Sequence, residues 1–203
     1  IGLRPISALV DVTNFFTFDR NRPLHVFDAD KVKGNLRIHR TTGGETLVGL
    51  DDKTYRFDAG QVVISDDHGV ESIAGIMGGL ATGCTHDTVN VFLEAAVWDR
   101  VQIAMTGRAL KINSDARYRN ERGIDPAFNM EAVDLATQLA QLVKVFVMAD
   151  HTLVYFVVVS FRRWHKLHTA ATQRTHCFVN IFSGQRNVLD AFTFIFADKF
   201  FNL

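Results

Sequence analysis

Apolar and polar residues alternate with a period of two through the middle of the chain, and this alternation predicts short β-strands. Turn-forming Gly, Asp and Lys residues separate the runs, and Asp67-His68-Gly69 has the composition of a hairpin turn. A last run, from Val89 to Ala96, closes this β-rich part. The predicted strands lie at 36–40, 46–50, 55–57, 61–65, 70–77 and 89–96.

A period near 3.6 residues predicts helices on either side of the strands. The first is expected to begin at Pro5, and a later one at Asp125 and Pro126, because proline fits the first helical position and aspartate the N-cap. The apolar face of a helix between them carries Trp98, Val101, Met105 and Ala109. The last helix has a buried stripe of Phe128, Ala132, Leu135, Ala136, Leu139, Leu142 and Val143. The predicted fold class is α+β, a β-rich core of mixed, sandwich-like sheets with helices at both ends.

The composition indicates a globular protein with no overall electrostatic preference. The chain has 203 residues, is 47% hydrophobic, and has a formal net charge of +0. Any contact with nucleic acid must therefore use a local patch. Cys84 and Cys177 have no neighbouring thiol, which favours a reducing, cytoplasmic setting over a disulfide framework or zinc site. The chain begins at Ile1 without a targeting pattern, and we expect a piece of a longer protein.

Residues 145–203 differ in composition from the rest. Ten of the seventeen phenylalanines fall there, and no glutamate follows Glu131. The run Val154 to Val159 is an uncharged, β-prone window that aggregates when exposed. It is too short to span a bilayer. The tail is therefore interpreted either as containing a buried strand or as disordered or out-of-frame sequence.

A single carboxylate marks the candidate site. In a strand over 89–96, Glu94 shares one face with Phe92 and Ala96. Because an unpaired carboxylate is costly away from water, Glu94 must lie at a pocket mouth, meet a cation or accept hydrogen bonds. Gly78 and Gly79 end an earlier strand, and allow either a positive-φ turn or close approach of a ligand. Both segments are expected to line one cleft.

Several motifs in order resemble one known family. They are Arg4-Pro5, Asp11 to Asn14, Arg22 to Asp28, Ala74 to Gly79, and Asn113 to Pro126. Residues 1–144 resemble the editing module, the third and fourth structural domains, of the β subunit of bacterial phenylalanine–tRNA ligase. The resemblance implies hydrolysis of tyrosine wrongly attached to phenylalanine tRNA. It also implies contact with the acceptor end of that tRNA and an α subunit as partner, with neither DNA nor a membrane.

The resemblance places the editing site at His25, Gly78, Glu94, Ser114 and Ala116, with Gly79 beside it. An ionised Glu94 would accept the phenol hydrogen bond that phenylalanine cannot make. His25, with a pKa near 6.5, would orient or deprotonate the attacking water. The glycines would let backbone N–H groups approach the ester, Ser114 would bond the substrate or the water, and Ala116 would leave room. No metal or other cofactor is expected in this fragment.

Each of these residues also has a purely structural interpretation. Glu94 can pair with a nearby arginine, and His25 can be a hydrogen-bonded core or loop residue. The glycines can form a simple tight turn, Ser114 can cap a helix, and Ala116 can be a small helical residue. Spacing alone does not decide between the two sets of roles.

Three arginines, Arg117, Arg119 and Arg122, form the densest basic cluster in the matching region. They are candidates for contact with the tRNA end, but interleaved acidic residues favour an internal ion-pair network. Two positions depart from the family. Asn120 replaces an expected aromatic residue and is expected to cost core packing, and Leu80 replaces an acidic one.

The sequence contains neither a Gly-rich phosphate loop nor a His-x-Gly-His pattern, so amino-acid activation is expected elsewhere. Three functions stay open at this point: a proofreading domain within a synthetase, a truncated non-catalytic tRNA-binding or scaffold fragment, and a free-standing deacylase.

Overall fold

The computed structural model describes residues 2–3, 5–147, 154–162 and 176–183, with side-chain surroundings up to residue 140. Its helices are α1 (Ala8–Asp19), α2 (Arg100–Ala109), α3 (Asp115–Asn120) and α4 (Asn129–Val147). Its early strands are β1 (His25–Asp28), β2 (Arg37–Arg40), β3 (Thr46–Val48), β4 (Thr54–Arg56) and β5 (Val62–Ser65). The later strands are β6 (Val70–Ile73), β7 (Met77–Gly78), β8 (Val91–Val97), β9 (Val154–Arg162) and β10 (His176–Ser183).

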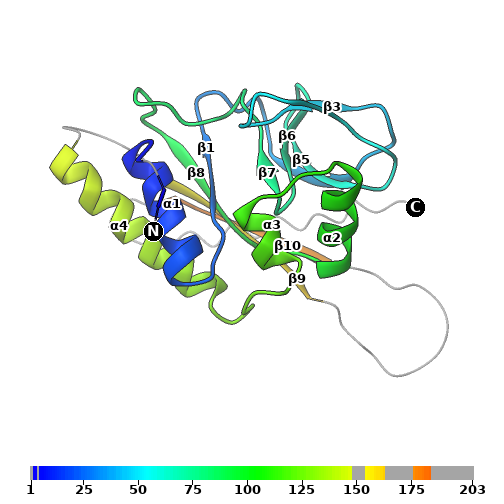
Figure 1. Cartoon of the computed structure of the whole chain (residues 1–203). Helices are drawn as coiled ribbons and strands as arrows, with labels where there is room; N and C mark the ends of the chain where they lie inside the picture. The colour runs from blue at the N-terminus through cyan, green and yellow to red at the C-terminus, as the bar shows by residue number, and fades with distance from the viewer. Residues whose placement is uncertain (1, 4, 148–153, 163–175, 184–203) are drawn as a thin grey trace.

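The strands form two four-stranded sheets and a small ribbon (Figure 1). One sheet has the order β1-β8-β9-β10, with β8 and β9 parallel and the other neighbours antiparallel. The second sheet, β2-β5-β6-β7, is antiparallel throughout, and β3 pairs with β4. With four helices around these sheets, the predicted α+β class is confirmed.

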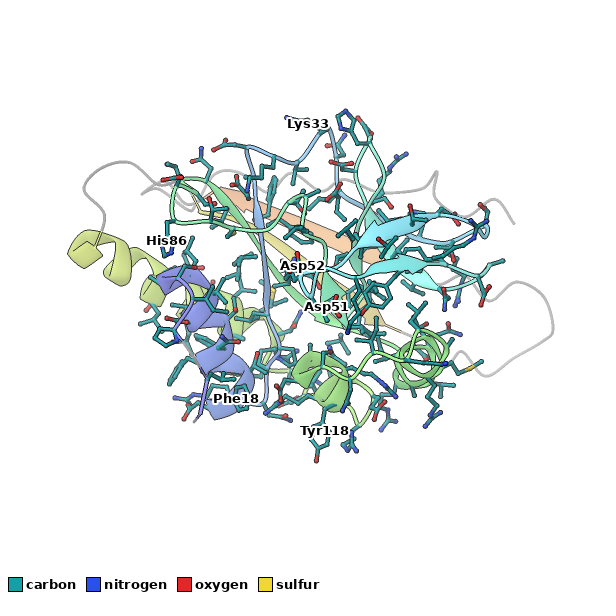
Figure 2. All side chains as sticks on the ribbon, turned by 45° about the horizontal axis from the view of Figure 1, so that its top comes forward. Phe18, Lys33, Asp51, Asp52, His86 and Tyr118 are labelled. Carbon is teal, nitrogen blue, oxygen red and sulfur yellow. The ribbon has the colours of Figure 1, made fainter. Side chains whose placement is uncertain are left out.

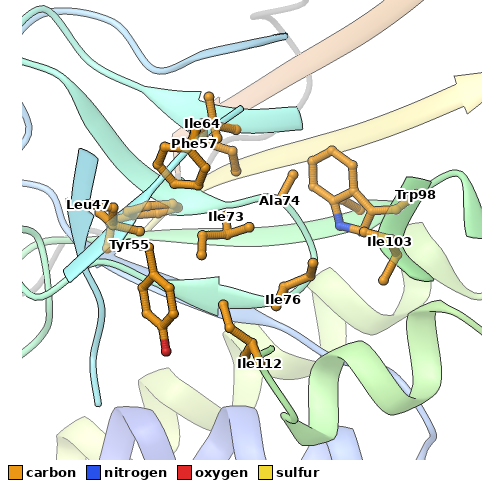
Figure 3. Packing of buried hydrophobic residues seen from close by; sticks show 13 residues of the cluster. Leu47, Tyr55, Phe57, Ile64, Ile73, Ala74, Ile76, Trp98, Ile103 and Ile112 are labelled. Atoms are coloured by element: carbon orange, nitrogen blue, oxygen red, sulfur yellow. The ribbon is translucent and has the colours of Figure 1, made fainter. Parts of the chain in front are cut away.

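Strand β8 separates two hydrophobic cores because its side chains alternate between its faces. Val91, Leu93 and Ala95 pack on one face against α1 and α4. Phe92 and Ala96 point to the other face and join the larger core. Figure 3 shows part of this larger core, where side chains from β3 to β6 meet Trp98 and residues of and beyond α2. The face of β8 that carries Glu94 is therefore the one turned toward the second sheet.

Two helix starts differ from the prediction. Helix α1 begins at Ala8 rather than Pro5, because the Ser7 side chain accepts a hydrogen bond from the Val10 amide at 3.4 Å and caps the helix. Helix α4 begins at Asn129. The Asp125 carboxylate instead accepts the Ala127 amide at 2.8 Å and forms a turn ahead of the helix.

Helix α2 turns a different face inward than its apolar spacing predicted. Its buried residues are Ile103, Thr106 and Gly107. Val101 and Met105 are 64% and 58% exposed, so the predicted apolar face lies on the outside. Burial of Gly107 has a steric cause, since a side chain there would overlap Arg117 of α3.

The predicted hairpin at Asp67-His68-Gly69 is confirmed, because β5 and β6 pair antiparallel across it. The strand predicted over 70–77 is interrupted after Ile73. Gly75 has a φ of 67°, in the left-handed region that glycine tolerates, and the chain turns there before β7. In the tail, Val154–Arg162 forms β9 beside β8. The boundary predicted at 144 falls within α4 and stays a prediction. The other predictions for the tail rest largely on residues outside the described ranges.

Candidate functional site

His25 and Glu94 occupy directly opposite positions on two paired strands. In the antiparallel register of β1 and β8, the Cα partner of His25 is Glu94. Directly opposite residues of an antiparallel pair project from the same face, with Cβ atoms about 4.5–5.5 Å apart. The sequence placed these residues 69 positions apart without a spacing rule, and strand pairing brings them together.

Glu94 is buried at 6% exposure, and its Oε2 has no hydrogen-bond partner among the described residues. Burial raises the pKa of its carboxyl group from 4.5 to about 8. The prediction of an ionised Glu94 is therefore wrong for this state, since the group is mostly protonated at neutral pH. The alternative was a salt bridge from Glu94 to an arginine of α3 or just beyond it. Within the described part of the chain these arginines, Arg117, Arg119 and Arg122, pair with Glu121 or Asp115 instead.

His25 is partly exposed as a residue, but its Nε2 is buried without a hydrogen-bond partner among the described residues. Burial lowers the pKa of the imidazole from 6.5 to about 4, so the ring is neutral at pH 7. The ring packs edge-on against Phe27, with centroids 4.4 Å apart. The pKa near 6.5 that the sequence analysis assumed for His25 is therefore too high for the buried ring.

Gly78 and Gly79 serve close packing rather than a left-handed turn, since neither has a positive φ. A Cβ built on Gly78 would lie 2.2 Å from Cε1 of His25. A Cβ on Gly79 would lie 2.6 Å from the Glu71 carbonyl oxygen, and the Gly79 amide donates to that oxygen at 2.8 Å. In this structure the group that approaches the Gly78 backbone closely is therefore the imidazole of His25. The Gly79 N–H is already engaged and is not free for an ester oxygen.

Ser114 is the N-cap of α3 and ties that helix to the second sheet. Its hydroxyl accepts the Arg117 amide at 3.1 Å and donates to the Ile76 carbonyl at 2.6 Å. Ile76 precedes Gly78 by two residues, so this bond anchors α3 beside the glycines. Ala116 follows on α3 with intermediate exposure. The structure thus gives Ser114 the helix-cap role, and catalytic or binding roles for Ser114 and Ala116 stay predictions.

The arginine cluster forms the predicted internal network. Arg117 and Arg122 both pair with Glu121, and Arg119 pairs with Asp115, each at 3.0 Å. Asn120, next to this network, is buried and donates from Nδ2 to the Gly75 carbonyl at 2.9 Å. Its Oδ1 has no partner among the described residues. Asn120, which stands where an aromatic residue was expected, therefore has a hydrogen-bonded Nδ2 and an unpaired Oδ1.

Sequence reasoning missed a buried arginine that joins both site strands. Arg22 is 1% exposed and precedes β1 by three residues. Its Nη1 donates to Asn129 Oδ1 at 3.0 Å, and Asn129 Nδ2 donates to the Ala95 carbonyl at 3.1 Å. Arg22 also donates to the Asp125 carbonyl. This chain of bonds holds β8 next to Glu94, but residues 107 apart in sequence give no local signal of it.

The chemistry available at this face is that of two neutral, hydrogen-bonding groups in an apolar setting. A protonated carboxyl group can both donate and accept, and a neutral imidazole has one nitrogen of each kind. Within the described residues, no three His, Cys, Asp or Glu side chains gather as metal ligands would. No helix in this part of the chain is both long and apolar enough to cross a membrane. The expectation that no cofactor is needed stays a prediction.

Comparison with known protein families places this α+β chain in one of them. A family model described as "B3/4 domain" matches residues 1–144. The chain belongs to the B3/4 domain family.

Individual relatives narrow the comparison. Over 139 residues the chain is 73% identical to the phenylalanine–tRNA ligase beta subunit of Ruegeria pomeroyi. It is 63% identical to the same subunit of Bradyrhizobium diazoefficiens and 61% to that of Rhodopseudomonas palustris. Each match covers 68% of this chain but 17% of the relative. These similarities support a relationship to part of that subunit and do not favour the non-catalytic scaffold interpretation.

Proposed function

We propose that residues 1–144 form a proofreading module that hydrolyses the ester between tyrosine and phenylalanine tRNA. The observation that carries the proposal is the facing pair of His25 and Glu94, each with a buried polar atom lacking a partner. A buried unsatisfied polar group costs about 1–3 kcal/mol, and native structures keep few of them. A substrate with a polar group at this position would remove that cost.

Glu94 selects the amino acid in this proposal. A tyrosine hydroxyl offers one donor and acceptor lone pairs, so it can bond the protonated carboxyl group in either direction. Phenylalanine would leave Oε2 unpaired, and a site of this kind rejects such an analogue by about 10⁴ to 10⁵. The neutral state of Glu94 suits the task, because an uncharged group costs less to bury while the site is empty.

His25 positions and activates the attacking water. Its lowered pKa has burial as its only cause, so a polar ester and a water molecule beside the ring reduce that cause. The pKa then moves back toward 6.5, where an imidazole is an effective base at neutral pH. Gly78 leaves room for the ring, and Ser114 fixes α3 next to it.

The wider setting is proposed from the family resemblance, and the name of the relatives supports only the synthetase subunit. The substrate is the acceptor end of phenylalanine tRNA, the assembly partner is the α subunit of the synthetase, and the compartment is the cytoplasm. The module itself uses no cofactor.

Release of tyrosine from mischarged phenylalanine tRNA tests the proposal. We expect release by the wild-type chain above the buffer rate. His25→Ala should lower kcat by about 10² to 10⁴ with little change in KM. Lys33→Ala, at an exposed loop position on the edge of the molecule (Figure 2), serves as the control and should match the wild type. No release by the wild type, or full activity of His25→Ala, would refute the proposed mechanism.

A further inference from the structure

The two helices beside the candidate site carry an excess of positive charge. Residues 99–123 contain six Lys or Arg and three Asp or Glu, whereas the whole chain has 22 of each kind. Helices α2 and α3 pack against each other, with Arg117 filling the space above Gly107. Their exposed side, called here the α2–α3 surface, carries Arg100, Met105, Arg108, Lys111, Tyr118 and Arg122.

Three of these cations have no internal counter-charge. Among the described residues, no carboxylate lies within ion-pair distance of Arg100, Arg108 or Lys111. Arg122 shares Glu121 with another arginine. The excess charge therefore faces solvent, where it attracts a polyanion.

Tyr118 adds an exposed aromatic ring to this basic surface. It is 54% exposed and points away from the body of the domain (Figure 2). The Arg122 guanidinium lies 3.7 Å from its ring centroid and holds the ring in place. Exposed aromatic rings beside cations are the means by which proteins bind single-stranded nucleic acid, with bases stacked on the rings.

The surface is continuous with the candidate site through α3. The Tyr118 amide donates to the Ser114 carbonyl at 2.9 Å, one helical turn from the residue that anchors α3 at Ile76. One turn of helix is about 5.4 Å. An RNA whose terminal ester lies beside His25, with the tyrosine hydroxyl at Glu94, therefore has this surface within reach of its last nucleotides.

We propose that the α2–α3 surface binds the single-stranded acceptor end of the RNA, with a base stacked on Tyr118 and phosphates held by Arg108 and Lys111. The inference rests on the proposed function, since it assigns a binding surface to the substrate of that site. A protein partner is the other occupant that a basic surface with exposed Met105 could serve, and the test distinguishes the two.

Binding of a fluorescent single-stranded RNA that copies the last four acceptor nucleotides of phenylalanine tRNA tests the inference on the full chain. Tyr118→Ala should weaken binding about 5- to 100-fold, whereas Tyr118→Phe should keep it within about twofold, because the ring is retained. The double variant Arg108→Ala, Lys111→Ala should reduce the salt slope of log K by about 1.4, at about 0.7 per phosphate. Lys33→Ala should leave both quantities unchanged.

Equal binding by Tyr118→Ala and wild type overturns the stacking assignment, as does equal loss in the Lys33→Ala control. Absence of RNA binding by the wild type overturns the inference and favours a protein partner on this surface. Release of tyrosine from mischarged tRNA is measured in parallel. Active wild type with an unaffected KM in Tyr118→Ala refutes this inference alone, whereas inactive wild type refutes the proposed function.

Discussion

Replacing Glu94 by glutamine tests whether the carboxyl group is buried and unpaired in the folded protein. Burial raises its pKa from 4.5 to about 8, so the folded state holds a proton that the unfolded state releases above pH 4.5. The contribution of this group to the free energy of unfolding is therefore fully present below pH 4.5 and is lost as pH rises toward 8. The loss is about 1.4 kcal/mol per pH unit in that window. Glu94→Gln has the same shape and no titration, so it should gain stability relative to wild type as pH rises.

His25 should show the opposite dependence of stability on pH. Burial lowers its pKa from 6.5 to about 4, so the unfolded state binds a proton first as pH falls, and stability is lost between pH 6.5 and 4. His25→Gln should therefore gain on wild type in acid.

Urea unfolding followed by circular dichroism from pH 4 to 8 measures both differences, and other titrating groups cancel in each comparison. The account predicts that the free-energy difference between Glu94→Gln and wild type grows by at least about 2 kcal/mol from pH 5 to pH 8, after allowance for structural relaxation. A difference that is flat with pH would mean that Glu94 is solvated or paired, and the selection argument would fail.

Two further substitutions probe the packing around the site. Gly78→Ala should destabilise the protein by about 1–3 kcal/mol in thermal melts, because the new methyl group overlaps the His25 ring. Gly69→Ala is the matched control, since a Cβ there would meet no atom within 4 Å. Its effect should stay within about 0.5 kcal/mol in the same melts. Asn129→Ala should cost about 2–5 kcal/mol, because it leaves Nη1 of the buried Arg22 and the Ala95 carbonyl without their hydrogen-bond partner. The exposed Gln138→Ala on the same helix should be near neutral in urea unfolding, and an equal effect of both would contradict the network.

Local pattern predicted the elements well where hydrophobic alternation and turn chemistry agree. The strand that carries Glu94, with its two apolar faces, and the hairpin at Asp67-His68-Gly69 both follow from a period of two. Helix starts were less predictable, because a polar residue such as Asp125 can cap a helix or close a turn. Tertiary bonds to Arg22 decided in favour of the turn.

The candidate site shows the limit of sequence reasoning more clearly. The resemblance named His25 and Glu94, but only the strand register shows that they face each other. Ionisation depends on burial, which sequence does not give. For this reason the charge assumed for Glu94 and the pKa assumed for His25 both differ from what the structure indicates. The outward turn of Val101 and Met105 on α2 likewise follows from the contact with α3, which no local period contains.

The preference for tyrosine over phenylalanine tests the central claim most directly. Release of each amino acid from phenylalanine tRNA is measured for wild type and Glu94→Ala, and the ratio of the two kcat/KM values is compared. The account predicts a wild-type preference of about 10⁴, which falls to about 10² or less in Glu94→Ala because a purely apolar pocket distinguishes a hydroxyl weakly. A variant that keeps the full wild-type preference would contradict the assignment of this buried carboxyl group as the selector.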